Sequence, residues 1–250
     1  MRNGFMAVAV AASMASGTMT AAQMHKAPAS TAAIAAALAN PARTDHAGDD
    51  ARRKAAEAVA FSGVASGDIV VDFIPGQSYW TRIFAGVVGP KGHVYAVWPR
   101  GAAKYAVEEK PALEAHKLAN VTAQADSAII TLPQKADIVW TVQNYHDIPN
   151  QGGEASIAAV NAAVFDALKP GGTYVVIDHA DAAGKGLADT GTLHRIDPAA
   201  VKAGVVKAGF VFVGESTALR NTADDHSRAV FDPAIRGNTD QFMLKFRKPG

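Results

Sequence analysis

A strand that ends at a proline-glycine pair and continues as a helix is the feature that most constrains this chain. Residues 69–74 (Ile-Val-Val-Asp-Phe-Ile) are mostly β-branched or aromatic, which is typical of a strand buried on both faces of a parallel sheet. Pro75 has no N–H group to donate to a neighbouring strand, so we expect the strand to end there. Beyond the turn, apolar residues recur at the spacing of a helix packed on a sheet: Trp80, Ile83, Phe84, Val87 and Val88.

A second strand, residues 92–98, follows the helix after the stop signal Gly89-Pro90. Such a strand-helix-strand unit crosses over right-handedly and binds nucleotide-like ligands at its first turn. Strand-like and helix-like segments then alternate to the end of the chain. We expect strands at 121–125, 136–142, 173–178, 210–216 and 241–246, and helices at 103–118, 154–168 and 198–208. The pattern predicts an α/β fold with a doubly wound, Rossmann-like sheet, mostly parallel, with an antiparallel C-terminal strand.

The first residues of the chain predict export. An apolar run from Phe5 to about Ala15 follows Arg2 and precedes small residues around Ala22, as in a secretory signal. The run is too short to cross a bilayer, which takes about 20 residues. We therefore expect an exported, periplasmic protein without a membrane span in its mature chain.

Three segments follow from this interpretation: a signal peptide at 1–22, a linker rich in Ala, Thr and Pro at 23–44 with one short helix expected at 32–39, and a single α/β domain at 45–250. Within the domain, residues 45–61 are expected to form an amphipathic helix that covers one side of the turn. The chain has no cysteine, which excludes disulfides, thiolate catalysis and cysteine-zinc sites.

The charge pattern gives no sign of a nucleic-acid partner. The formal net charge is +1, and the only basic run, Arg52-Arg53-Lys54, lies in the helical segment, where a solvated face is expected. A small molecule is the expected ligand, and the oligomeric state stays open.

Several motifs together resemble a known family: Asp72-x-x-Pro75-Gly76, Gly89-Pro-Lys-Gly-x-Val-Tyr-Ala-Val97, Asn144-Tyr-His-Asp147, Thr192-Leu-His-Arg-Ile-Asp197 and Thr239-Asp-Gln-Phe242. They are similar to class I S-adenosylmethionine (SAM) dependent methyltransferases and, more narrowly, to a family of exported, predicted methyltransferases. The resemblance covers roughly residues 45–249. It implies SAM as the cofactor and methyl transfer to a small acceptor.

The resemblance also implies a set of cofactor-binding residues. Asp72 would hold the amino end of the methionine moiety, Gly76 would let the backbone approach closely, and Asp126 would contact the adenine amino group. The family pattern Asp/Glu-x-Gly-x-Gly-x-Gly reads Asp72-x-Ile74-x-Gly76-x-Ser78 here, and Trp98 stands where SAM enzymes place a ribose-binding acid. A plain tight turn is the alternative. The expected cofactor-binding set is Asp72, Pro75, Gly76, Gln77, Ser78, Trp98, Asp126 and Asn144.

At the acceptor side we expect three catalytic residues. His146 could take a proton from a nucleophilic acceptor, and Tyr145 could close over the sulfonium by a cation–π contact. His179 adds an imidazole at the end of the fifth strand. A helix-entry turn capped by Asp147 or Asn150 is the alternative for this segment.

Two further functions stay open. The first is an exported binding protein that keeps the fold without SAM-dependent catalysis. The second is a metal-dependent enzyme that uses His146, Asp178, His179 and His226, although no His-x-x-x-His spacing is present and no metal ligand is assigned. Arg195, Arg220 and Arg228 could recognise an anionic substrate or anchor loops by ion pairs with Asp224 or Asp225.

Overall fold

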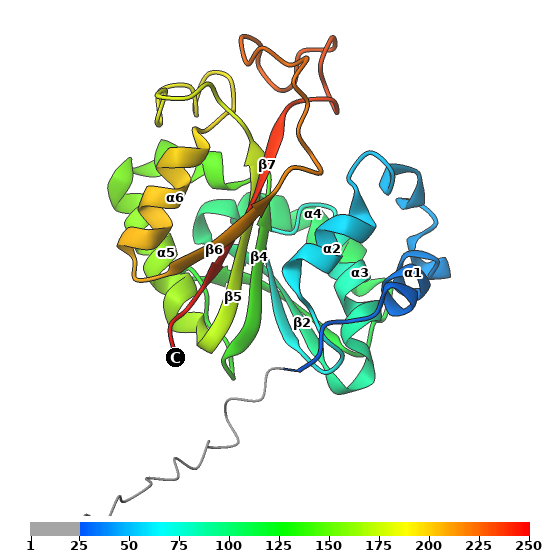
Figure 1. Ribbon diagram of the computed structural model, residues 1–250. Helices are drawn as coiled ribbons and strands as arrows, with labels where there is room; N and C mark the ends of the chain where they lie inside the picture. The colour runs from blue at the N-terminus through cyan, green and yellow to red at the C-terminus, as the bar shows by residue number, and fades with distance from the viewer. Residues whose placement is uncertain (1–25) are drawn as a thin grey trace, which may run out of the picture.

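The structure, a computed structural model, describes residues 26–250 as a seven-stranded sheet between two layers of helices (Figure 1). The strand order is β3-β2-β1-β4-β5-β7-β6. The first five strands pair in parallel, and β7 pairs antiparallel with both β5 and β6. This confirms the expected doubly wound, mostly parallel sheet. The strands are β1 Ile69–Phe73, β2 His93–Pro99, β3 Val121–Ser127, β4 Ala136–Val142, β5 Leu168–His179, β6 Val211–Ser216 and β7 Gln241–Arg247.

Helices cover both faces of the sheet (Figure 1). On one face lie α1 Thr31–Leu38, α2 Ala55–Ser62 and α3 Tyr79–Val88, with α4 Ala103–Glu114 over β2 and β3. On the other face lie α5 Glu154–Ala167 and α6 Pro198–Lys207. Short 3-10 turns occupy Pro41–Arg43, Ala47–Asp49, Gly89–Lys91, Arg100–Ala102, Tyr145–Asp147 and Pro149–Gln151.

The predicted strand-turn-helix unit is present, and its helix α3 packs as its apolar spacing indicates. All five residues of the predicted stripe are buried. Trp80 and Phe84 each lie with ring centroids 5.1 Å from Trp140 of β4, in edge-to-face arrangements. These aromatic contacts fix the start of α3 against the centre of the sheet, and so fix the turn between β1 and α3.

The segment before β1 contains the short helix expected within 23–44, but not the single helix expected at 45–61. Helix α1 lies inside the expected linker and packs on α3, burying Ile34 and Ala37. The approach is close, because a Cβ added at Gly86 would lie 2.9 Å from the Ala37 Cβ. In the region expected to be one helix, residues 45–61, the α-helix begins only at Ala55, after the short 3-10 turn Ala47–Asp49.

The predicted signal peptide, residues 1–22, lies outside the described residues, as do residues 23–25. Across residues 26–250, no helix has the length and apolar character that a bilayer crossing needs.

Two long connections rise above the carboxyl ends of the strands (Figure 1). One runs from β5 to α6 and the other from β6 to β7. The guanidinium of Arg195 joins them, since it donates to both Asp224 carboxylate oxygens at 2.9 and 3.0 Å and to the carbonyl of Ala180. Both partners of this ion pair are buried, so the two connections are held as one body above the sheet edge.

Candidate functional site

A cleft of about 160 Å³ opens at the carboxyl ends of the parallel strands, where ligands bind in open α/β sheets. Its walls come from the segments after β1, β2, β3 and β4 and from helix α5. The lining residues are Phe73, Ile74, Pro99, Gly101, Ala102, Ala128, Ile129, Ile148, Gln151, Ser156, Ala159 and Val160. Gln151 and Ser156 are the polar side chains in this lining, and neither was identified from the sequence because neither belongs to a motif.

The turn after β1 has three residues in the left-handed region at alternate positions. Ile74, Gly76 and Ser78 have φ values of +58°, +54° and +61°. These are the three positions at which the family pattern has glycine. A β-branched residue such as isoleucine is a conformational outlier there, and such outliers persist only where the surroundings enforce them. The turn therefore keeps the backbone shape of a glycine-rich loop although two of the three glycines are replaced.

Asn144 is one of the groups that hold this turn in place. Its side-chain amide donates to the carbonyl of Ile74 at 2.9 Å and to the carbonyl of Val142 at 2.7 Å. It thus ties the end of β1 to the end of β4. On the other side of the turn, a Cβ added at Gly76 would meet no atom within 4 Å, so the glycine borders open space.

Asp72 is buried beneath the turn and faces helix α3. The Thr81 hydroxyl donates to its carboxylate at 2.6 Å. Burial raises the pKa of Asp72 to about 7, although the hydrogen bonds from Thr81 act in the opposite direction. Asp72 therefore supports the first turn of α3, and it does not line the cleft.

The other residues of the turn and Trp98 have separate positions. Pro75 and Ser78 are buried, Gln77 is exposed, and the Ser78 hydroxyl has no hydrogen-bond partner. Trp98 is fully buried under α4, and its indole N–H donates to Glu109 at 2.7 Å. Its ring is thus covered by protein, and Pro99 takes the place beside the cleft. Asp126 belongs to β3, but its side chain lies outside what the structure describes.

Tyr145 does not face the open edge where a catalytic residue was expected. The 3-10 turn after β4 directs it into the core, where it is fully buried and its hydroxyl accepts a hydrogen bond from Asn161 at 2.8 Å. Burial raises the pKa of Tyr145 above its ordinary value. The expected cation–π wall is therefore replaced by a structural contact with α5.

His146 and Asp178 form a buried pair between β4 and β5. The imidazole Nδ1 lies 2.8 Å from one carboxylate oxygen of Asp178, and the backbone N–H of His146 donates to the other oxygen at 2.8 Å. Burial acts against the charged imidazolium, but the charge and hydrogen bond of Asp178 outweigh it and raise the pKa of His146. Asp178 thus fixes the ring and leaves Nε2 directed away from it.

His179 lies beside this pair, with its ring centroid 5.9 Å from that of His146. Its Nδ1 is 2.7 Å from the hydroxyl of Thr239. Burial lowers the pKa of His179 to about 4, with the charges of His146 and Arg195 acting in the same direction and Asp178 against it. His179 is therefore neutral at neutral pH.

The remaining charged residues of the long connections mostly anchor those connections. Arg195 pairs with Asp224, Arg220 with Asp240 and Arg228 with Asp232. His226 also bonds Asp240, at 3.1 Å. The ion-pair interpretation of the arginines is thus the one that the structure supports, and His226 is not gathered with His146, Asp178 and His179 as the metal alternative required.

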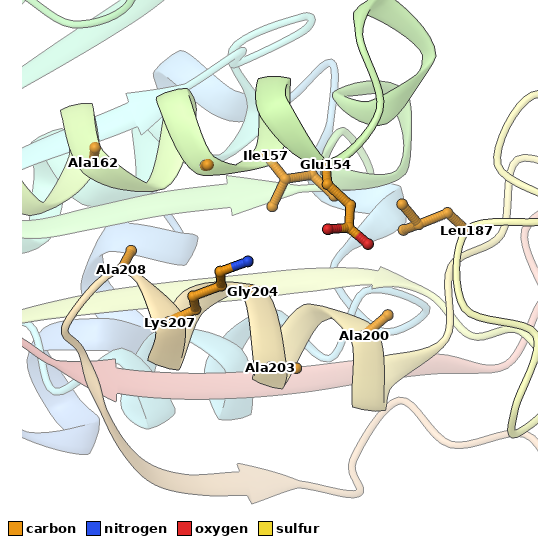
Figure 2. A pocket seen from close by; sticks show the side chains of 10 residues that line it. Glu154, Ile157, Ala162, Leu187, Ala200, Ala203, Gly204, Lys207 and Ala208 are labelled. Atoms are coloured by element: carbon orange, nitrogen blue, oxygen red, sulfur yellow. The ribbon is translucent and has the colours of Figure 1, made fainter.

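A larger cavity of about 490 Å³ lies elsewhere, between α5 and α6 (Figure 2). Its walls are mostly alanine and other apolar residues, and Glu154 and Lys207 are its charged lining residues. No candidate catalytic residue lines it. Ala158 faces this cavity, whereas its neighbour Ala159 faces the cleft at the sheet edge.

Comparison with known proteins gives matches only at the level of structure. No family model matches the chain, and no curated protein matches it. A SAM-dependent methyltransferase from Aquifex aeolicus has a TM-score of 0.54 at 15% identity, over 87% of this chain and 98% of that one. The chain has the class I methyltransferase fold.

Other solved structures with this fold are similar to the chain to the same degree. A putative sarcosine dimethylglycine methyltransferase from Galdieria sulphuraria has a TM-score of 0.57 at 14% identity, over 84% of this chain and 91% of that one. The glycopeptide N-methyltransferase MtfA, complexed with sinefungin, has a TM-score of 0.55 at 17% identity, over 80% and 87%. At such identities the likeness establishes the fold alone.

Proposed function

We propose that the chain transfers a methyl group from SAM to a small acceptor. The observation that carries the proposal is the turn after β1, where Ile74, Gly76 and Ser78 keep left-handed backbone at the three glycine positions of the family pattern. Two of these residues adopt a conformation that they disfavour, at the edge where this fold binds ligands. Strained backbone of this kind clusters at ligand-binding and active sites, which favours a ligand at this turn.

The cleft beside the turn is the proposed SAM site. Its present volume of about 160 Å³ is below the range of roughly 300 to 1,000 Å³ that is usual for ligand pockets. An exposed side chain narrows it, because Gln151 lies so close to Gly101 that a Cβ there would be 2.5 Å from the amide oxygen. Rotation of Gln151 would widen the cleft without moving the backbone.

Gln151 and Ser156 are the groups that we assign to the ribose hydroxyls. Among the lining side chains that the structure describes, which do not include that of Asp126, there is no carboxylate, and Trp98 occupies the usual position of the acid. Neutral hydrogen bonds are weaker than those of a carboxylate, so SAM would be held less tightly than in enzymes that keep the acid.

His146 and His179 are the residues that we assign to the acceptor. Attack of a hydroxyl or amine on the sulfonium methyl group breaks the S–CH3 bond and releases a proton, which Nε2 of His146 could accept when the ring is in its neutral form, while Asp178 stabilises the resulting imidazolium. We also propose that the protein is exported, as the signal peptide predicted at residues 1–22 indicates.

Calorimetric titration of SAM into the purified protein tests the proposal. Ala159→Trp should fill the cleft and weaken SAM binding at least tenfold. Ala158→Trp is the matched control, since it places the same side chain on the same helix but in the larger cavity. Absence of SAM binding at millimolar ligand, or weakening by the control and not by Ala159→Trp, would contradict the proposed site.

A further inference from the structure

Three potential metal ligands meet just above the carboxyl end of β4. They are His146 and Asp147 from the turn after β4, and His194 from the connection between β5 and α6. One ligand atom from each residue lies within 4.8 Å of the others. The Oδ1 atom of Asp147 is 3.5 Å from Nε2 of His146 and 3.6 Å from Nδ1 of His194.

These separations suit a shared cation better than direct hydrogen bonds. Both exceed the usual N–H···O range of about 2.7–3.2 Å. Two ligands bound tetrahedrally at about 2.0–2.2 Å from one metal ion lie roughly 3.4 Å apart. The carboxylate oxygen is thus placed at the distance that a common metal partner would impose on each imidazole.

His146 is already held as metal-binding histidines are. Its Nδ1 is engaged by the buried carboxylate of Asp178 at 2.8 Å, which leaves Nε2 as the ligand atom. A carboxylate behind a ligating imidazole fixes the ring orientation and raises its basicity. This contact is independent of the three proposed ligand atoms.

His194 is held in place by its neighbours in the chain and in space. Its backbone lies in the left-handed region at φ +56°, and Phe231 packs edge-on against its ring with centroids 4.8 Å apart. The next residue, Arg195, is locked by its buried ion pair with Asp224. The imidazole is therefore directed to His146, with ring centroids 5.4 Å apart.

We propose that Nε2 of His146, Oδ1 of Asp147 and Nδ1 of His194 bind a divalent transition-metal cation. Two imidazoles and one carboxylate suit Zn²⁺, Fe²⁺, Co²⁺ and Mn²⁺ better than Ca²⁺ or Mg²⁺, which prefer oxygen ligands. The side chains of Asp147 and His194 are 50% and 31% exposed, which gives an ion a route from solvent. Three protein ligands leave coordination positions open for water or an oxygen of a small molecule.

A cation at this site would act on the acceptor of the proposed methyl transfer. Its catalytic role rests on the proposed function, whereas its binding does not. A cation at this place would occupy Nε2 of His146, and it would lower the pKa of a coordinated hydroxyl instead of His146 taking the proton directly. Metal binding itself requires neither SAM nor turnover, so the two proposals can fail separately.

The test uses the full chain, stripped with chelator and dialysed. Co²⁺ titration followed by visible absorption, and Zn²⁺ titration followed by calorimetry, should each give one equivalent per chain. Asp147→Asn and His194→Ala, both at partly exposed positions, should weaken binding at least tenfold. His93→Ala is the control, since it removes an imidazole at the opposite, amino end of β2 and should leave binding unchanged.

Thermal unfolding of each variant separates loss of the site from loss of the fold. Asp178→Asn gives a second measurement, because a metal held by His146 should bind 10- to 100-fold more weakly when the ring loses its partner. Less than a tenth of an equivalent at millimolar Co²⁺ and Zn²⁺, or binding that survives both ligand substitutions, would overturn the inference. SAM titration of the same samples shows whether the cofactor proposal stands on its own.

Discussion

At the scale of single residues, the turn after β1 combines the backbone shape of a glycine-rich loop with unfavourable local chemistry. Ser78 begins helix α3 with left-handed backbone, its side chain makes no capping hydrogen bond, and its hydroxyl is buried without a partner. Left-handed backbone costs a non-glycine residue about 1–2 kcal/mol, and a buried unsatisfied hydroxyl adds to this. The turn after β1 thus lowers the stability of the folded protein locally.

We predict that Ser78→Gly raises the free energy of unfolding by about 1–2 kcal/mol, because it removes both the left-handed strain and the unpaired hydroxyl. Ser78→Ala removes only the hydroxyl and should gain less. Urea unfolding of the three proteins measures the differences. Equal gains for glycine and alanine would show that backbone strain at this position contributes nothing.

The buried carboxyl of Asp72 should make stability depend on pH. Its pKa is about 7 in the folded protein and near 3.8 when unfolded, so the folded state binds the proton more tightly. Its favourable contribution is complete below pH 4 and is lost as pH rises through 7, a loss of roughly 4 kcal/mol.

Asp72→Asn, which keeps the size of the side chain, should therefore be more stable than the wild type at pH 8 and close to it at pH 4. Urea unfolding across this pH range measures the effect, with exposed Asp166→Asn as the control. Identical pH profiles for Asp72→Asn and the wild type would contradict the prediction.

At the scale of elements, helix α1, a short helix expected within a linker, packs into the helical layer. Its alanine-rich composition fits an exposed helix as well as a buried one. Docking depends on the small residue Gly86, which lets Ala37 approach α3 closely. That pairing of two distant small residues is invisible in the local pattern.

Ile34 measures how firmly α1 is docked, since its side chain is 3% exposed. We predict that Ile34→Ala lowers the free energy of unfolding by about 2–4 kcal/mol, from lost burial and the cavity left behind. Val107→Ala on α4, where the valine is 74% exposed, should change it by less than about 0.5 kcal/mol. If Ile34→Ala also lowered the free energy of unfolding by less than about 0.5 kcal/mol, α1 would be shown to detach without affecting the rest of the fold.

The elements were predictable from sequence where hydrophobic periodicity decides them, as in β1, α3 and β4. The edge at which His146 and His179 meet followed from the parallel order of the strands. The inward direction of Tyr145 and the burial of Trp98 did not, because they depend on a single 3-10 turn and on the position of Glu109. The connection that carries His194 was expected at the same edge, but the orientation of its ring toward His146 was not predictable, because the Arg195 anchor beside it joins two distant connections.

At the scale of the whole molecule, the two candidate sites share one edge of the sheet but use different parts of the chain. The cleft is built from segments between β1 and α5, whereas the proposed cation site needs the connection after β5. The Arg195–Asp224 ion pair anchors the connection after β5 to the connection between β6 and β7. Loss of this anchor would therefore affect the cation site more than the cleft. Both sites still depend on β4, whose carboxyl end lies between them.

The position of β7 has a consequence for the order in which the protein can assemble. This strand is synthesised after the six other strands of the sheet, yet it lies inside the sheet and pairs with β5 from Thr173 to His179 as well as with β6. Until Arg247 has left the ribosome, that edge of β5 lacks its partner and β6 has no strand to join. The sheet can therefore be completed only after β7 has been synthesised.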